Sequence, residues 1–308
     1  MDLHDLSTDT LFTSRHSFSV RYSPDGNHLL FRGSPDLFGT TGHDVEPGII
    51  PNDYDAQLYL FDPGSKQARS LTLDFDPSVE HAVWNPADGK IYLKAEAGSY
   101  KKFYRADPAT LEFEELPFPA KVADSWSLST DGHWIGFTAS SSGYPDVGFL
   151  MDTRSLALTR VADPRREIME DIRLGEHRDW SFEHDGTRIE GMVYYPPDFS
   201  PDSSYPMIVY YYGGTSPTNR SFGGRYPKNL FAAHGYVVLV IQPSGATGYG
   251  QEFSARHVNN WGRTVAEEII SGTEKFCEDH PFIDRRRIGC IGASYGGFMT
   301  MLLMTRTE

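Results

Sequence analysis

Residues 287–298 read RIGCIGASYGGF, and this stretch decides the fold of the chain. Residues 288–291 form a short apolar strand pattern, and the apolar run 298–304 can continue as a buried helix. The Gly-x-Ser-x-Gly pattern between them is typical of a nucleophile elbow, a turn so tight that the positions two before and two after the serine need almost no side chain. The pattern alone is weak in a chain with 29 glycines, so the flanking strand and helix carry the assignment. We predict that Ser294 stands exposed at this junction.

The residues before the elbow alternate between strand and helix patterns. Residues 207–212 and 236–241 are continuous apolar runs, which are typical of strands covered on both faces. A short helix pattern at 229–234 ends at Gly235, and a longer one from about 265 to 279 keeps its apolar residues on one face. Strand, helix, strand, helix, strand and elbow, in this order, predict the first half of an α/β-hydrolase sheet.

The first half of the chain repeats a hairpin pattern. An Asp-Gly turn joins two stretches rich in aromatic and β-branched residues at Gly26, Gly89 and Gly132. Each hairpin is followed by a second strand pair, with turns that begin at Asp62, Asp107 and Asp152. Four short strands in about 40 to 45 residues are typical of a β-propeller blade. We therefore predict a partial β-propeller of about three to four blades, with residues 33–55 as an inserted loop; an ordinary antiparallel sandwich is the alternative.

The change of pattern places a domain boundary near residues 173–177. We assign residues 1–174 to the partial β-propeller domain and residues 175–308 to the N-terminal half of an α/β-hydrolase domain. The chain stops at Glu308, soon after the elbow, so we expect a hydrolase sheet truncated after Ser294 and a missing C-terminal segment. An apolar strand left at the edge of such a sheet would promote association, so a homo-oligomer is possible.

Composition narrows the classes of partner. The formal charge is −14, from 42 acidic and 28 basic residues with no basic run, which gives no electrostatic support for binding nucleic acid or an anionic membrane. The two cysteines, Cys277 and Cys290, exclude a disulfide framework and lack metal-ligand spacing, and we expect neither a metal nor a cofactor. The sequence has no apolar run of about 18 residues and no signal peptide at its start, and the localisation stays open.

Three motifs give the chain a specific resemblance. They are Tyr212-Gly213-Gly214, the stretch 244–250 (SGATGYG) followed by Trp261-Gly262, and the elbow itself. In this order they resemble a serine peptidase of the prolyl oligopeptidase family, nearest its dipeptidyl peptidase IV-like branch. The resemblance implies a propeller beside an α/β-hydrolase domain, and cleavage of short peptides, after proline or a small residue, through an acyl-enzyme.

The elbow chemistry assigns three residues. Ser294 would be the nucleophile, which needs a histidine base within hydrogen-bond reach. The backbone N–H of Tyr295, the residue after the nucleophile, would be one oxyanion donor. By resemblance the second donor is the hydroxyl of Tyr212. Tyr210 and Tyr211 are the competing candidates, but alternation along the strand points Tyr211 to the opposite face from Tyr212, and we expect both to pack under the helices.

The chain departs from the family in what it lacks. Every histidine, including His234, His257 and His280, precedes Ser294, and no aspartate follows it. We expect His280 to serve the end of a helix and His257 to be a solvated or packing residue. No acid pair that could bind a substrate amino terminus is identifiable, because Glu114-Glu115 and Glu267-Glu268 read as solvated faces. The isolated 308-residue chain, without the triad Asp and His, is therefore predicted to be inactive or nearly so.

Two other functions are compatible with the sequence. An esterase or acylaminoacyl hydrolase would use the same elbow, although the propeller repeats and Tyr212 argue against a simple lipase. A non-catalytic propeller binding module or pseudoenzyme is favoured only by the missing Asp and His. The residue preferred before the cleaved bond, and the choice between exopeptidase and endopeptidase, are not readable from these residues.

Overall fold

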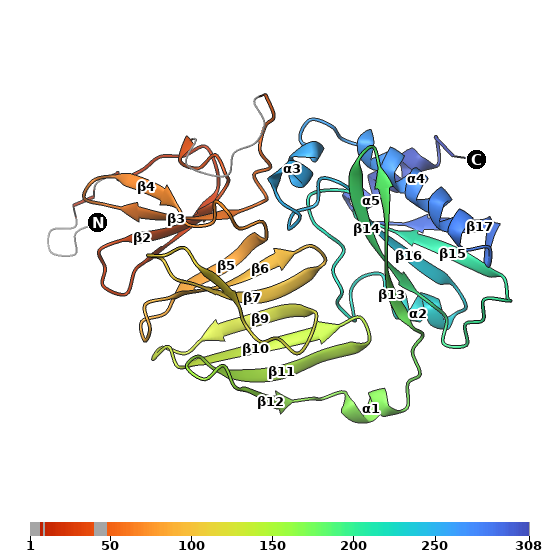
Figure 1. Cartoon of the computed structure of the whole chain (residues 1–308), viewed down its shortest axis with the longest axis horizontal. Coiled ribbons are helices and arrows are strands. Elements are labelled where there is room, and N and C mark those ends of the chain that lie inside the picture. The colour runs from red at the N-terminus through yellow and green to blue at the C-terminus, as the bar shows by residue number, and fades with distance from the viewer. Residues whose placement is uncertain (1–6, 9, 40–47, 308) are drawn as a thin grey trace.

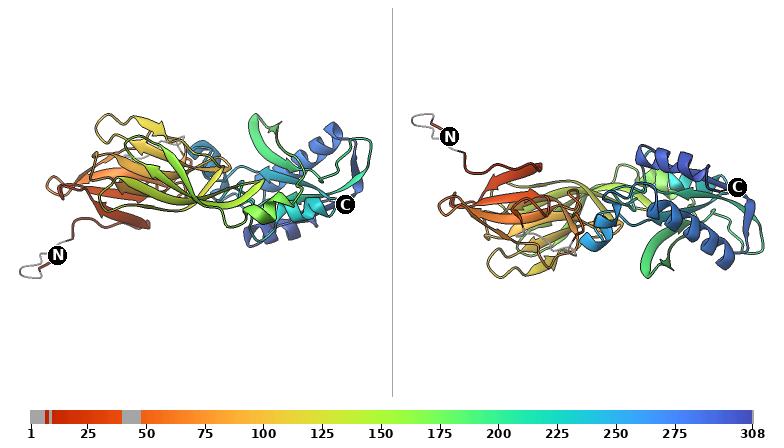
Figure 2. Two further views of the ribbon diagram at one scale, coloured as in Figure 1. Left: turned by 90° about the horizontal axis from the view of Figure 1, so that it is seen from below. Right: turned by 90° about the horizontal axis from the view of Figure 1, so that it is seen from above.

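The computed structural model describes residues 7–8, 10–39 and 48–307. Strands β1–β12 lie on one side of the molecule, and a mixed sheet with helices lies on the other (Figure 1). The views along the other axis show an elongated molecule with the two parts end to end (Figure 2). No helix of the described residues is long and apolar enough to cross a membrane.

The β part contains three successive antiparallel units of four strands. The first is β1 (Phe18–Tyr22), β2 (Leu29–Gly33), β3 (Gln57–Asp62) and β4 (Gln67–Ser70). The second is β5 (Ser78–Trp84), β6 (Ile91–Ala97), β7 (Tyr100–Ala106) and β8 (Phe113–Glu115). The third is β9 (Val122–Leu128), β10 (Trp134–Ser141), β11 (Tyr144–Asp152) and β12 (Leu158–Ala162).

These units confirm the predicted hairpins. Gly26, Gly89 and Gly132 occupy the turns β1–β2, β5–β6 and β9–β10 with positive φ of 74°, 72° and 75°. A parallel contact between β7 and β9 joins the second and third units into one sheet, and the described residues form no closed ring of sheets. The predicted insertion at 33–55 falls between β2 and β3, and its residues 40–47 lie outside the described part of the chain.

The second turn of each unit uses the same side-chain chemistry. One carboxylate oxygen of Asp62, Asp107 or Asp152 accepts two backbone N–H groups, two and three residues further on, at 2.7 to 3.4 Å. These N–H donors hold the pKa of each carboxyl below its ordinary value. The same aspartate turn recurs between the third and fourth strands of each unit. This recurrence indicates a repeated structural unit rather than an irregular sandwich.

The second part is built on a five-stranded sheet with the order β13-β14-β16-β15-β17. Strands β13 (His177–His184) and β14 (Thr187–Tyr194) form an antiparallel hairpin, and β14 also pairs antiparallel with β16. Strands β15 (Tyr205–Tyr210), β16 (Val237–Gln242) and β17 (Ile283–Ile291) are parallel, with β17 at the edge of the sheet. Oligomerisation through that edge stays a prediction.

Helices cover both faces of this sheet. Helices α4 (Thr264–Asp279) and α5 (Tyr295–Leu303) pack on one face, against Val237, Leu239 and Ile241. Helix α2 (Lys228–Ala233) packs on the other, against Val238 and Val240. Alternate residues of β16 thus enter two cores, which explains the continuous apolar run of this strand.

Short elements complete the connections. Helix α1 (Arg166–Glu170) precedes β13, and the predicted domain boundary between 174 and 175 falls in the irregular segment between them. Helix α3 (Gln251–Ser254) is followed by a 3₁₀ turn (Ala255–His257). Two predicted strand bounds were wrong. Strand β15 ends two residues earlier than expected, at Tyr210, and β17 begins five residues earlier, at Ile283, because its charged N-terminal half hides the strand pattern.

Replacement of Asp152 by alanine tests the repeated turn. The variant loses two acceptor contacts to backbone N–H groups, so we expect its thermal midpoint at pH 7 to fall by roughly 1–3 °C. Because the folded pKa of Asp152 is lowered, its stabilisation is complete above the ordinary pKa and disappears as the pH falls through the lowered value. Asp152→Asn retains an acceptor oxygen and serves as the control. Equal midpoints for the aspartate and alanine proteins at pH 7 would contradict this account.

Candidate active site

The elbow holds Ser294 in a strained conformation. Its φ of 54° and ψ of −118° lie where non-glycine residues are rare, and it directly precedes α5. A Cβ added to Gly292 would lie 2.7 Å from the backbone C and O of Gly296, and one added to Gly296 would lie 3.0 Å from the carbonyl oxygen of Tyr211. These close approaches require glycine, and they leave the serine exposed at the end of β17.

Tyr295, the residue after Ser294, is held in place by its side chain. Its hydroxyl accepts the backbone N–H of Gly262 at 2.9 Å, and its ring lies edge-on to those of His257 and Phe298, at 4.9 and 5.3 Å. Within the described residues, no carbonyl accepts the backbone N–H of Tyr295. That N–H is therefore free to bind a developing oxyanion beside Ser294.

The three consecutive tyrosines before the Gly-Gly turn take three different environments. Tyr212 is half-buried, its ring lies beside Gly214 and its centroid is 6.3 Å from that of Tyr295. Tyr211 is fully buried, and its hydroxyl is 3.1 Å from that of Thr300 on α5. Burial raises the pKa of Tyr211 above its usual range. Tyr210 packs on Tyr226, next to the core under α2.

A cavity of about 1090 Å³ lies between the two parts of the molecule. The β part contributes residues 15–16, 36, 39 and 49–54 to its lining. The α/β part contributes Tyr212, residues 214–215, 257–259 and 261, and Tyr295. The structure thus brings both predicted oxyanion residues to one cavity, with Ser294 exposed next to Tyr295 in sequence. A third wall, from the β part, was not visible in the sequence.

Two of the three histidines considered as bases, His257 and His280, are engaged in packing. His257 is 6% exposed and stacks on Trp261 at 6.3 Å; its Nδ1 has no partner among the described residues, and burial lowers its pKa. His280 donates from Nδ1 to the carbonyl of Phe276 at 2.8 Å and stacks on that ring, at the end of α4. His234 is exposed at the end of α2. Among the described residues, no side chain hydrogen-bonds the hydroxyl of Ser294.

The expectation that Glu267 and Glu268 are both solvated was wrong for Glu268. Its side chain is fully buried and accepts two hydrogen bonds at 2.7 Å, from the backbone N–H and the hydroxyl of Ser244. Burial raises its pKa. Position 268 follows the buried Val265 by three residues, so helical periodicity could have shown it. Glu114 and Glu115 do lie at the surface, paired with Arg105 and Lys102.

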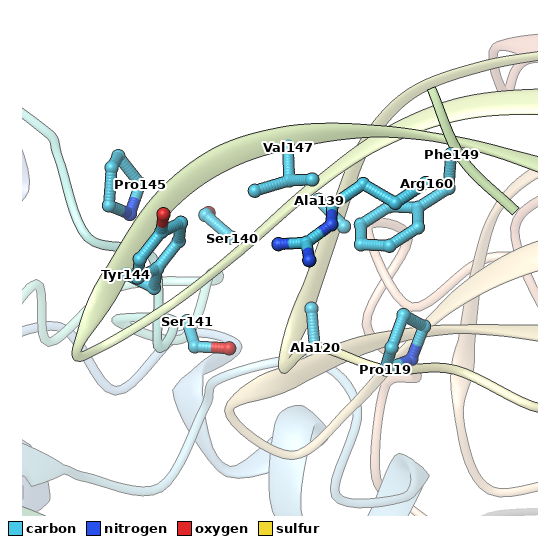
Figure 3. A pocket seen from close by; sticks show the side chains of 10 residues that line it. All are labelled: Pro119, Ala120, Ala139, Ser140, Ser141, Tyr144, Pro145, Val147, Phe149 and Arg160. Atoms are coloured by element: carbon cyan, nitrogen blue, oxygen red, sulfur yellow. The ribbon is translucent and has the colours of Figure 1, made fainter. Parts of the chain in front are cut away.

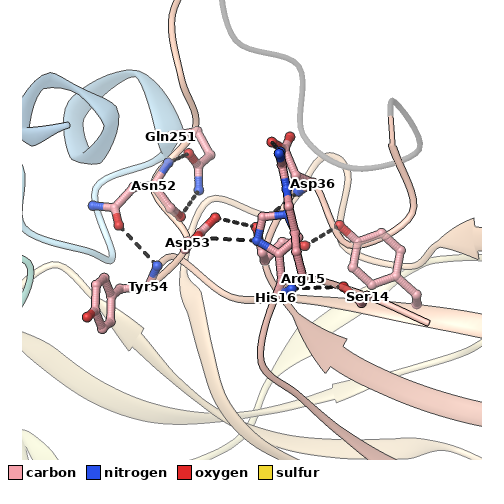
Figure 4. Close-up of polar contacts among 10 residues, drawn as sticks. Ser14, Arg15, His16, Asp36, Asn52, Asp53, Tyr54 and Gln251 are labelled. Atoms are coloured by element: carbon pink, nitrogen blue, oxygen red, sulfur yellow. Dashed lines mark hydrogen bonds and ion pairs between the residues drawn. The ribbon is translucent and has the colours of Figure 1, made fainter. Parts of the chain in front are cut away.

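Buried polar contacts tie the two parts together beside the cavity. Asn52 and Asp55 of the β part contact Gln251 and Ser254 of α3, as Figure 4 shows for Asn52 and Gln251. The hydroxyl of Ser254 donates to Asp55 at 2.7 Å, and burial raises the pKa of Asp55 to about 6. Further along the interface, the Thr247 hydroxyl donates to Glu96 at 2.6 Å, and burial raises the pKa of Glu96 as well.

A smaller cavity, of about 320 Å³, lies in the third unit of the β part. It is lined mainly by apolar side chains, and the Arg160 guanidinium points into it (Figure 3). Arg160 and Tyr144 both bind Asp163, at 3.0 and 3.1 Å. This cavity contains none of the predicted site residues. The described residues contain no group of three His, Cys, Asp or Glu side chains that could hold a metal ion.

Sequence comparison identifies relatives of the chain. Residues 224–308 match the model of the prolyl oligopeptidase family. The probable dipeptidyl-peptidase 5 of Aspergillus terreus is 37% identical over 263 residues, covering 79% of this chain and 34% of that protein. The dipeptidyl-peptidase 5 of Porphyromonas gingivalis is 24% identical over 244 residues, covering 79% and 35%. The chain thus spans about a third of the length of the curated relatives it matches.

Structural comparison shows which fold the chain shares. The acylaminoacyl peptidase of Pyrococcus horikoshii superposes with a TM-score of 0.77 at 22% identity, over 96% of this chain and 44% of that one. A putative dipeptidyl aminopeptidase IV from Bacteroides ovatus superposes with a TM-score of 0.70 at 20% identity, over 94% and 50%. Both parts of the molecule are therefore matched together, and the likeness extends to their arrangement.

Gly292, inside the tight turn, and Gly297, just after it, allow a matched test of the elbow. Gly292→Ala places a Cβ against backbone that cannot move without shifting α5, so we expect a loss of about 1–3 kcal/mol in unfolding free energy. At Gly297 the nearest atom would lie 3.7 Å away, and Gly297→Ala in the helix should stabilise by about 0.5 kcal/mol. Denaturant unfolding of both variants measures this. Equal stability of the two proteins would refute the tight-turn account.

Proposed function

The chain belongs to the prolyl oligopeptidase family, and we propose that it carries the nucleophile and the oxyanion hole of a serine peptidase that acts on short peptides. The observation that carries this proposal is Ser294, exposed and strained at the start of a helix, beside a free backbone N–H and a tyrosine-lined cavity. Backbone strain of this kind costs of order 1–3 kcal/mol, and a module that only binds would gain nothing from it. The pseudoenzyme alternative is therefore disfavoured.

The chemistry assigns one role to each residue. The Ser294 hydroxyl attacks the peptide carbonyl carbon and gives its proton to a histidine base, which then protonates the leaving amine. Water attacks the resulting ester, and the acid product leaves with the serine restored. In both steps the carbonyl oxygen carries negative charge, which the Tyr295 N–H and the Tyr212 hydroxyl would stabilise by hydrogen bonds. No described residue is assigned as the base or as its aspartate partner.

We propose the β part as an incomplete propeller of three four-stranded blades, residues 1–174, that forms one wall of the substrate cavity, with residues 175–308 as the hydrolase domain. The likeness of both parts to the acylaminoacyl peptidase fold supports this division. A dipeptidyl specificity is supported by the name of the 37% identical relative. An acylaminoacyl specificity is the runner-up, because the structural likeness concerns the fold alone.

The 308-residue polypeptide by itself should hydrolyse a proline-type chromogenic substrate at close to the background rate. The physical reason is that no described side chain hydrogen-bonds Ser294, and an oxyanion hole without a base retains only a small part of the rate enhancement. The measurement is turnover together with labelling by a fluorophosphonate probe. Stoichiometric labelling of Ser294 would show instead that an upstream histidine had been recruited; His257→Ala would then abolish it if that residue were the base.

Replacement of Tyr212 by phenylalanine, in a form of the enzyme that carries a complete triad, tests the second oxyanion donor. We expect kcat to fall by about 10²-fold to 10³-fold with little change in KM, because the lost hydrogen bond forms mainly in the transition state. Tyr211→Phe is the matched control. It loses a buried bond to Thr300, so it should lower stability by roughly 1 kcal/mol and leave turnover alone. An unchanged kcat with a lowered thermal midpoint for Tyr212→Phe would remove Tyr212 from the oxyanion hole.

A further inference from the structure

The wall that the β part contributes to the cavity is apolar at its surface. Ile49, Ile50 and Tyr54 line the cavity and are 44%, 54% and 71% exposed. From the other part of the molecule, Trp261 lines the same cavity and is 69% exposed. Large apolar side chains scattered singly on a surface need no explanation, but four that line one cavity from two parts of a molecule indicate a binding surface.

The charged groups of the same cavity have polar partners within the protein. Asp53 accepts the hydroxyl of Ser34 at 2.7 Å and lies 3.2 Å from Nδ1 of His16. Arg15 lies 3.7 Å from Asp36. Each of these charged groups therefore has a polar partner within the protein, and we take apolar contact as the main source of discrimination at this wall.

One buried side chain makes three of the hydrogen bonds that hold the apolar wall in place. Residues 49–54 belong to no helix or strand, so their position depends on contacts outside the segment. The Gln251 carboxamide supplies them, because its Oε1 accepts the N–H of Asn52 at 3.0 Å and its Nε2 donates to the carbonyls of Asn52 and Asp55 at 3.3 and 3.2 Å. Gln251 is 4% exposed. The side chain therefore satisfies backbone N–H and carbonyl groups of residues 52–55, as a neighbouring β-strand would.

Further bonds from the same helix support this contact. The Asn52 amide donates to the carbonyl of Ser254 at 3.0 Å, and the Ser254 hydroxyl donates to Asp55. All four residues are buried, so each unmade bond would leave a buried polar group unsatisfied. Trp261 follows this helix in the chain, only ten residues after Gln251. One short piece of chain thus holds the apolar wall and presents the aromatic side chain of the opposite wall.

We propose that residues 49–54 and Trp261 together form a subsite for a bulky apolar side chain of a peptide, and that Gln251 is the positioning residue of this subsite. The inference rests on the proposed function, because it takes this cavity as the place where the peptide binds. It adds a substrate class: peptides with an aromatic or large aliphatic residue at the position that faces the β part.

Equilibrium binding of two neutral probes tests the subsite. The probes are the tripeptides alanyl-phenylalanyl-alanine and alanyl-seryl-alanine, titrated into the 308-residue chain and followed by calorimetry. We expect the aromatic peptide to bind about 10-fold more tightly, as a partly enclosed apolar pocket allows. Tyr54→Ser and Ile50→Ser should reduce this preference to about 2-fold or less, because they weaken binding of the aromatic peptide more than binding of the seryl peptide.

Matched exposed residues elsewhere provide the controls. Tyr22 is 69% exposed on β1 and Ile168 is 62% exposed on α1, and neither lines the cavity. Tyr22→Ser and Ile168→Ser should keep the full preference. Gln251→Met preserves volume and removes the three hydrogen bonds, so it should lose the preference as Tyr54→Ser does; if it unfolds, Ser254→Ala takes its place with a smaller loss.

Equal affinities of the native chain for the two peptides, no binding of either, or a preference that survives in Tyr54→Ser and Ile50→Ser together would each refute the subsite. A preference that survives in a folded Gln251→Met protein would refute the positioning role. The titrations use Ser294→Ala as a parallel background, because binding needs no chemistry. Failure of Ser294 as nucleophile is read from turnover in a form of the enzyme with a complete triad, so it is distinguishable from failure of the subsite.

Discussion

The contact on which the rest of the site depends is the approach of two backbones at the elbow. Gly292 and Gly296 lie so close that a Cβ on the first would overlap the peptide group of the second. This contact ends β17, starts α5 and drives Ser294 to positive φ in one step. Because α5 begins there, the N–H of Tyr295 has no partner among the described carbonyls. The proposed nucleophile and one proposed oxyanion donor thus both follow from one packing contact.

The sheet supplies the rigid support that such a strained turn needs. Strand β17, which leads into the elbow, pairs with β15, which ends at Tyr210. The elbow and Tyr212 therefore follow the ends of two neighbouring strands. Tyr211 is locked under α5 by its hydrogen bond to Thr300, which leaves Tyr212 on the side of the cavity. The packed strands and helices, rather than the loops, therefore fix the positions of these side chains.

Local chemistry made much of this structure predictable. The Asp-Gly turns, the two-sided apolar strand 236–241 and the elbow glycines each act through neighbours in sequence, so their patterns are visible in the chain. The contacts that were missed join distant residues. Asn52 and Gln251 are 199 positions apart, and Glu268 looks like a surface residue until Ser244 is placed beside it. The outer half of β17 was missed for a related reason, since its charged residues face solvent at a sheet edge.

The carboxyl groups buried between the two parts have a thermodynamic consequence of their own. Burial raises the pKa of Asp55 to about 6, and the pKa of Glu96 is raised by the same cause. A carboxyl whose pKa is raised in the folded protein takes up a proton on folding when the pH lies between its ordinary and its raised pKa. Its stabilising contribution is complete below the pKa of the free side chain and is lost as the pH rises through about 6. Folding of the chain is therefore linked to proton uptake at these two carboxyls, and mild acid stabilises the folded protein through them.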